Sequence, residues 1–140
     1  MKNKYKRIIL PDLSYQLMGV LFKVQNKLGC SYQEKYYQRA IEQELKSQKI
    51  LFDRESEIEL SYEGTKIGKY FLDFIVEGKI ILEVKTLPFI KKESIVQLVA
   101  YLVATDLPLG FIANFRTEKL SYKRVVNPNL KNKNISSDSL

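Results

Sequence analysis

The amino-acid sequence predicts an α/β fold in which helices flank a mixed central β-sheet. Residues 70–86, YFLDFIVEGKIILEVKT, form two almost continuous apolar runs separated by a turn at residues 77–79. Such runs are typical of central strands that are covered on both faces. The segments before and after this hairpin carry apolar residues at helical spacing. A chain of 140 residues is long enough for one domain with a substantial core.

Before the hairpin, the sequence predicts a basic arm, two helices and a strand. Residues 1–11 form the arm, and the apolar spacing in residues 17–28 indicates the first helix. Asp12 or Ser14 is its expected N-cap, and Gly29 is expected to end it in the left-handed conformation. A second helix is expected over about residues 32–48. Residues 50–61 read as a strand, in which alternating glutamates indicate one solvent-exposed face.

After the hairpin, a helix is expected from about Lys92 to Thr105, because apolar residues recur there at helical spacing. Residues 109–114 predict a short buried strand, and residues 120–126 predict a last strand. From Asn127 the composition changes to Asn, Lys and Ser with few large apolar residues. The sequence therefore predicts one domain over residues 1–126 and a disordered tail over residues 127–140.

Three polar residues interrupt the apolar hairpin: Asp73, Glu83 and Lys85. Burying an unpaired charge costs several kcal/mol, so these residues need a reason to be there. If Val76 pairs with Ile80 across a three-residue loop, Asp73 lies opposite Glu83, and all three polar side chains share one face. A two-residue loop would separate the two carboxylates. The polar cluster therefore favours the three-residue loop.

Glu34 is a further candidate, on the second predicted helix. It shares a stripe with Tyr37, Ile41 and Leu45 at spacings of three and four. A carboxylate on this inward stripe is a candidate site residue. Ser31 and Glu34 also match the capping-box pattern, in which Glu34 only bonds back to the Ser31 amide. The residues by themselves leave both interpretations open.

The spacing Asp73…Glu83-Val84-Lys85 resembles the signature of the metal-dependent nucleases of the PD-(D/E)xK superfamily. Within that superfamily the chain resembles the small group called GxxExxY proteins, over roughly residues 13–126, although Ser31 stands where the group has its first motif glycine. The supporting motifs are Glu34-x-x-Tyr37, Tyr62-x-Gly64, Gln97-x-x-x-Tyr101-Leu102, Asn114-Phe115 and Lys123-Arg124-Val125. The resemblance implies a restriction-endonuclease-like core and favours a site role for Glu34.

Two carboxylates on one sheet face can hold a hard divalent cation through oxygen ligands. Mg²⁺ is the expected cation, with Mn²⁺ as a substitute. Lys85 beside it can orient a water molecule or offset charge on the transition state. The resemblance adds the backbone carbonyl of Val84 as a ligand and Gln97 as a catalytic residue. The expected metal ligands are Asp73, Glu83, Val84 and Glu34. The expected nucleic-acid contacts are Tyr37, Tyr101, Lys123 and Arg124.

The charge and the cysteine and histidine content limit which partners and which kinds of catalytic site the protein can have. The net charge of +7 favours a polyanionic partner, with DNA favoured over RNA, although a basic soluble protein with no such partner also fits. The chain has no histidine and one cysteine, Cys30, which excludes a Cys–His catalytic pair and an internal disulfide. A reduced, cytoplasmic setting fits this cysteine content. No signal peptide is visible, and no stretch approaches the length of a membrane span.

The sequence leaves alternatives to a metal-dependent nuclease that cleaves phosphodiester bonds. Asp73, Glu83 and Lys85 would form a buried ion-pair network if they were purely structural, although apolar residues usually replace such networks at no cost. Gln97 and Tyr101 would then be ordinary surface residues. A catalytically weak module of the same fold would bind nucleic acid or a protein partner. A homodimeric accessory subunit would use an exposed strand edge.

Overall fold

The structure is a computed structural model that describes residues 9–130. The elements follow the order α1 (Pro11–Leu28), α2 (Glu34–Ser47), β1 (Phe52–Tyr62), β2 (Thr65–Val76), β3 (Ile80–Lys85), α3 (Lys92–Thr105), β4 (Leu109–Asn114) and β5 (Ser121–Val126). The basic arm expected at the N-terminus lies mostly outside the described residues, and so does most of the expected tail. No helix within residues 9–130 is long and apolar enough to cross a membrane.

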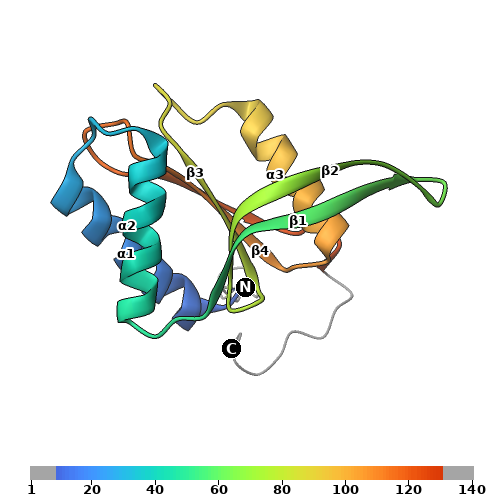
Figure 1. The fold of residues 1–140 in the computed structure, drawn as a ribbon, viewed down its shortest axis with the longest axis horizontal. Helices are drawn as coiled ribbons and strands as arrows, with labels where there is room; N and C mark the ends of the chain where they lie inside the picture. Colours follow the sequence, from blue (N-terminus) through green and yellow to red (C-terminus); the bar gives the residue numbers. More distant parts are fainter. Residues whose placement is uncertain (1–8, 131–140) are drawn as a thin grey trace, which may run out of the picture.

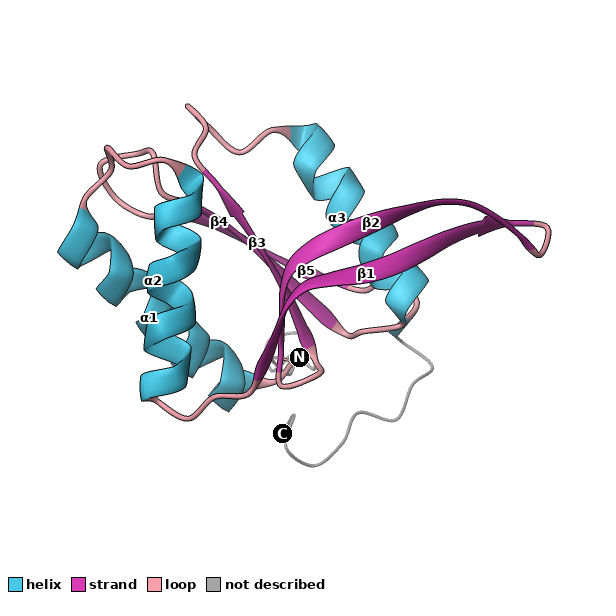
Figure 2. Ribbon diagram, viewed as in Figure 1, coloured by secondary structure: helices cyan, strands magenta, loops and turns pink. Residues whose placement is uncertain are grey.

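The five strands form one sheet in the order β1-β2-β3-β4-β5. β3 and β4 run parallel, and the other neighbouring strands are antiparallel, so the sheet is mixed, as predicted. A parallel pair needs a crossover connection, which α3 supplies on one face. The helices α1 and α2 cover the opposite face, and this arrangement confirms the α/β class (Figures 1 and 2).

Each face of the sheet has its own apolar core. The core under α1 and α2 includes Leu17, Tyr37, Ile41, Phe74, Leu82 and Val84. The core under α3 includes Leu72, Ile81, Leu98, Leu102 and Ile112. Consecutive residues of β3 are thus buried on opposite faces, which explains why its sequence is apolar at nearly every position.

The outer half of β2 departs from the prediction. Residues 65–71 pair with β1 in a long hairpin that reaches beyond the rest of the molecule (Figure 1). Phe71 is 55% exposed, although its neighbour Leu72 is fully buried. Both residues belong to the same apolar run of the sequence. The expectation of two covered faces therefore fails before Leu72, because no helix covers the outer face of the hairpin there.

Two expected helix caps are also wrong in detail. Leu10 precedes α1 with a φ of 50°, and no side chain caps the helix. The Ser14 hydroxyl lies inside the helix and donates to the carbonyl of Ile9 at 3.4 Å. At the other end, Gly29 has the expected positive φ of 81°, but its ψ of −153° lies outside the left-handed helical region. Its N–H donates to the Gln25 carbonyl at 2.7 Å and closes the last turn.

The fold also continues past the predicted boundary at residue 126. Asn127 is 2% exposed, and its side-chain amide donates to the carbonyls of Leu102 at 3.0 Å and Leu107 at 2.9 Å. These bonds fasten the end of β5 to the C-terminal end of α3. The prediction of disorder from residue 127 is therefore wrong at Asn127, while residues 131–140 lie outside the described range.

Candidate active site

The polar residues of the central hairpin meet where β2 and β3 separate. Val76 pairs with Ile80 and Phe74 with Leu82, so the loop has three residues, as predicted from the polar cluster. Beyond the Phe74–Leu82 pair the two strands diverge, and β2 continues into the long hairpin while β3 continues beside β4 (Figure 1). We call the opening between residues 72–73 and residues 83–85 the fork. Asp73 and Glu83 face each other across it.

The pairing of β1 with β2 is interrupted beside the fork. Arg54 pairs with Phe74 and Ser56 with Leu72, but the residues between them, Glu55 and Asp73, are not paired. Glu55 has a φ of 49°, which is unusual for a residue with a side chain. Asp73 thus has no partner in the β1 register, and its backbone N–H donates to the Glu83 carboxylate on β3.

Each carboxylate at the fork binds the backbone of the opposite strand. The Asp73 Oδ2 accepts from the Val84 N–H at 2.8 Å, and the Glu83 Oε2 accepts from the Asp73 N–H at 3.1 Å. In a strand the N–H and C=O of one residue point to the same side, so the Val84 carbonyl also faces the fork. The Lys85 carbonyl points the other way and accepts from the Phe115 N–H at 2.9 Å. The fork thus collects carboxylate and carbonyl oxygens.

The two carboxylates carry more negative charge than their surroundings offset. Burial raises the pKa of Asp73, although the Val84 N–H and the charge of Lys85 act in the opposite direction. Burial, followed by repulsion from Asp73, raises the pKa of Glu83 to about 8. Buried acids that repel each other are stabilised by a shared proton or by a bound cation. The fork therefore favours one of these two charge states.

Lys85 lies near the carboxylates without pairing directly with them. Its positive charge lowers the pKa of Asp73, Glu83 and Glu34, which indicates that its ammonium group lies near all three. Within residues 9–130, however, no ion pair joins Lys85 to any of them. Backbone amides hold the carboxylates instead. This arrangement differs from the purely structural ion-pair network considered for the hairpin.

Glu34 reaches the fork from the side of the helices. It is the first residue of α2, whose N-cap is Gln33 rather than Ser31, and no side chain caps this helix. The capping box considered for Ser31 is therefore not formed. The Glu34 Oε2 accepts from the Gln38 side chain at 3.3 Å. Burial, and then the charge of Asp73, raise the pKa of Glu34.

These oxygens fit a cation that needs few protein ligands. In the described part of the chain, no group of three or more Asp, Glu, His or Cys side chains is already arranged to hold a metal ion. Mg²⁺ keeps several of its water molecules and is commonly held by only one or two carboxylates. The carboxylates of Asp73 and Glu83, with the Val84 carbonyl, match that requirement. A cation that demands a complete protein cage does not fit.

Arg54 is a residue at this site that sequence reasoning missed. Its Nε donates to the Asp73 carbonyl at 3.2 Å, and its two terminal nitrogens donate to Glu42 at 2.6 Å and Gln38 at 3.1 Å. Gln38 in turn donates to Glu34, so this chain of bonds connects Asp73 on β2 to Glu34 on α2. Arg54 is the only basic residue in the predicted strand 50–61, and that exception was the available signal.

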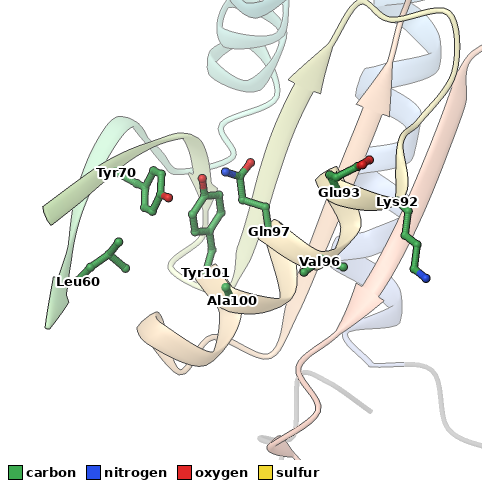
Figure 3. A pocket seen from close by; sticks show the side chains of 8 residues that line it. All are labelled: Leu60, Tyr70, Lys92, Glu93, Val96, Gln97, Ala100 and Tyr101. Atoms are coloured by element: carbon green, nitrogen blue, oxygen red, sulfur yellow. The ribbon is translucent and has the colours of Figure 1, made fainter. Parts of the chain in front are cut away.

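The helix α3 contributes Gln97 and Tyr101 at the edge of the fork. Burial, and then the negative charge of Glu83, raise the pKa of Tyr101 to about 12, so its hydroxyl lies close to the carboxylates. The Tyr101 ring packs against Tyr70, with 4.9 Å between the ring centroids. Gln97 is exposed and points to the same side of α3 (Figure 3). The structure thus brings both residues near the site.

Two of the expected nucleic-acid contacts are engaged within the protein, Tyr37 in the interior and Arg124 at a partly buried position. Tyr37 is fully buried, donates its hydroxyl to the Gly29 carbonyl at 2.6 Å and stacks on Phe115 at 4.6 Å. The Arg124 side chain donates to the Ile9 carbonyl at 2.6 Å, and burial lowers its pKa. Tyr37 is therefore not accessible to nucleic acid in this conformation, which corrects that expectation, whereas Arg124 is only partly buried and stays a predicted contact. Lys123 is exposed and remains available.

Comparisons with known proteins agree with this geometry. The family described as the PD-(D/E)XK nuclease superfamily matches residues 11–125 of the chain. The solved structure titled "Crystal structure of SSO0001" is similar over 67% of this chain and 50% of that chain, with a TM-score of 0.54 and 22% sequence identity. The present chain thus corresponds to half the length of that protein, and at this identity the similarity concerns the fold. No curated protein matches the chain.

Proposed function

The chain belongs to the PD-(D/E)XK nuclease superfamily, and from this membership we propose that it is a metal-dependent nuclease that hydrolyses phosphodiester bonds. The observation that supports this proposal most strongly is the pair of carboxylates at the fork, Glu83 buried and Asp73 partly buried, whose pKa values are raised. Members of the superfamily are usually nucleases with divalent metals, and their substrate is nucleic acid. We propose DNA ahead of RNA, and Mg²⁺ with Mn²⁺ as a substitute. The closer resemblance to GxxExxY proteins rests on the sequence motifs.

We assign the cation to the carboxylates of Asp73 and Glu83 and to the Val84 carbonyl, which share the fork. When bound, Mg²⁺ polarises the phosphate and lowers the pKa of a bound water molecule. Glu34, whose pKa is raised by burial and by the charge of Asp73, is a candidate to exchange a proton with water at the fork. Arg54 positions Asp73 through the Asp73 carbonyl and is not itself expected to touch substrate.

The remaining residues have roles toward the phosphate and the nucleic-acid strand. Lys85 has no ion-pair partner among the described residues, so its ammonium group is available to offset negative charge on the phosphate in the transition state. Gln97 can orient a water molecule or a phosphate oxygen. Tyr101 donates from a hydroxyl that stays protonated at all physiological pH values. Lys123 adds an exposed positive charge.

One observation favours a second candidate function. No ready group of three metal-binding side chains exists within residues 9–130, and a site with two carboxylates can bind a cation weakly. A nuclease-fold module that binds nucleic acid or a protein partner, with little turnover, would have the same fold. The two functions differ in whether the protein cleaves nucleic acid at the fork or only binds it.

The test combines a cleavage assay with thermal unfolding in the presence and absence of Mg²⁺. The variants are Asp73→Asn, Glu83→Gln and Lys85→Met. Glu118→Gln is the control, because Glu118 is an exposed glutamate that is not among the charges shifting the pKa values at the fork. Labelled single-stranded and double-stranded DNA and RNA serve as substrates. The acid variants should lose cleavage and Mg²⁺-induced stabilisation together. Lys85→Met should lose cleavage but retain the stabilisation.

Three outcomes would contradict the proposed nuclease function or its assignment to the fork. A wild-type protein that neither cleaves nor gains stability from Mg²⁺ or Mn²⁺, but still binds nucleic acid, supports the binding module. If cleavage persisted in both acid variants, the assignment of the fork as the active site would be wrong. Early melting of all three variants would instead indicate a structural role, because breaking a truly buried ion pair costs about 3–5 kcal/mol.

A further inference from the structure

A groove lies between the long β1–β2 hairpin and α3, beside the fork. It has a volume of about 440 Å³, within the range of small-molecule sites. We call it the arm groove and define it by Leu60, Tyr70, Val96, Gln97, Ala100 and Tyr101. Lys92 and Glu93 line its far end, so the charges there nearly cancel (Figure 3). None of the roles proposed above accounts for Tyr70 or for the apolar part of this groove.

We propose that the arm groove binds an unpaired nucleobase whose neighbouring phosphate lies at the fork, and that the protein therefore prefers single-stranded nucleic acid. This inference rests on the nuclease function proposed above and specifies its substrate. The occupant is one base of the same strand that the fork engages. It is not a second, independent ligand.

The position of the groove connects it to the carboxylates. Tyr101 belongs to both places, because its ring lines the groove while its hydroxyl lies near Glu83 and Asp73. Tyr70 lies three residues before Asp73 on the same strand and packs against Tyr101 at 4.9 Å between ring centroids. A strand with its phosphate at the fork would thus have an adjacent base at the tyrosine end of the groove. The chemistry of the phosphate and of the base then comes from one continuous ligand.

The lining suits a base better than it suits a phosphate. Aromatic rings and aliphatic side chains dominate it, and bases stack on aromatic side chains whatever their sequence. The Gln97 amide, on the same side of α3 as the Tyr101 hydroxyl, can donate to and accept from the edge of a base (Figure 3). Tyr70 is 38% exposed, so part of the residue remains open to a stacking base.

The preference for single strands follows from the accessibility of the base. In a duplex each base is stacked and paired, and extracting it costs a few kcal/mol. An unpaired base avoids that cost. The charge of the protein, +7 over the whole chain, attracts both forms, so the groove and not the net charge supplies the discrimination.

The test measures binding without divalent metal, so that it does not depend on cleavage. Fluorescence anisotropy compares a short labelled single strand, the matching duplex, and an abasic strand of the same length, in DNA and in RNA. Tyr70→Leu removes the stacking ring, and Tyr70→Phe restores it. Ala100→Phe fills the groove from an exposed helix position. Tyr62→Leu is the matched control, an exposed tyrosine on the same hairpin outside the groove.

Wild-type protein should bind the normal strand about 5- to 150-fold more tightly than the abasic strand, which corresponds to stacking of one base. Tyr70→Leu and Ala100→Phe should abolish that difference, while Tyr70→Phe and Tyr62→Leu should retain it. If Tyr70→Leu melts early, Ala100→Phe decides the outcome. RNA and DNA strands should both show the effect, because stacking does not need the sugar hydroxyl.

Equal affinity for normal and abasic strands would overturn the proposal, and so would an equal loss in Tyr62→Leu and Tyr70→Leu. A concentration-dependent dimer that Ala100→Phe dissociates, without any base dependence, would assign the groove to a second copy of the chain. If binding depended on the base but no cleavage occurred, the proposed base site would stand and the proposed nuclease function would be wrong. If cleavage required Asp73 but binding did not depend on the base, the nuclease function would stand and the proposed base site would be wrong.

Discussion

The raised pKa of Glu83 predicts that the metal-free protein loses stability as the pH rises. The folded protein holds the Glu83 proton with a pKa of about 8, whereas the ordinary value is 4.5. The folded state therefore binds this proton more tightly than the unfolded state does. The resulting stabilisation is fully present below pH 4.5 and is lost as the pH rises through about 8. The experiment therefore compares the stability of the metal-free protein at about pH 5 and about pH 9.

The size of this loss follows from the difference between the two pKa values. A difference of about 3.5 between 4.5 and about 8 corresponds to an upper limit of about 5 kcal/mol, at about 1.4 kcal/mol for each pKa unit. The charge of Asp73 contributes to the Glu83 shift, and the pKa of Asp73 is itself raised, so the loss belongs to the pair. We expect a loss of a few kcal/mol in the free energy of unfolding, or roughly 10 °C in Tm.

Glu83→Gln separates this effect from other causes of alkaline destabilisation. Glutamine keeps the shape of the side chain and an oxygen that can accept from the Asp73 N–H, but it carries no charge. Its melting temperature should fall less than that of wild type over the same pH interval, and at pH 9 it should melt later. Glu118→Gln should follow wild type, because Glu118 is exposed.

Mg²⁺ should oppose the loss, because a cation stabilises the deprotonated carboxylates and its binding releases the proton. The rise in Tm on adding Mg²⁺ should therefore be larger at pH 9 than at pH 6 and absent in Glu83→Gln. Melting followed by circular dichroism in metal-free and Mg²⁺-containing buffers measures both effects. A flat pH profile for wild type, or the same slope in Glu83→Gln, would refute the reasoning about the carboxylate pair.

Three further predictions concern the rest of the fold. Tyr37→Phe should cost about 1 kcal/mol through the lost bond to the Gly29 carbonyl, as measured by urea unfolding, and any weakening of nucleic-acid binding would contradict its internal role. Gly110→Ala should destabilise by about 1–3 kcal/mol, because a Cβ there would lie 2.8 Å from the Leu98 side chain; unchanged urea unfolding would show that α3 adjusts. If Lys123 contacts a phosphate of double-stranded DNA, Lys123→Gln should reduce the slope of log affinity against log salt by about 0.9. Arg124→Met should leave this slope unchanged. The opposite pattern in a salt titration would identify Arg124 as the contact instead.

The convergence of Asp73, Glu83 and Lys85 could be predicted from the sequence because it depends on short-range geometry. Side chains alternate along a strand, and a loop of three residues places Asp73 opposite Glu83. Both constraints act within about a dozen residues and need no knowledge of the other elements. The apolar character of β3 likewise predicted burial on both faces, since each of its faces meets a helix layer.

Other features depended on contacts between segments that are distant in the sequence. The inward stripe of α2 carried Tyr37 and Glu34 alike, but only the packing of α2 buries Tyr37 against Phe115 and leaves Glu34 at the fork. Arg124 and Lys123 were equivalent as basic residues of one strand. Alternation sends them to opposite faces, and only Arg124 is partly buried and bound to the backbone before α1.

The sequence by itself determined the hairpin, its register and the three polar residues, because strand period and turn length are local properties of the chain. The tertiary structure decided where the sheet opens, how Arg54 joins α2 to Asp73, and how the long hairpin and α3 enclose the arm groove. These features arise from elements up to several dozen residues apart. A local pattern specifies which face of a strand is apolar, but only the packed fold specifies whether a helix, a solvent-filled groove or a ligand covers that face.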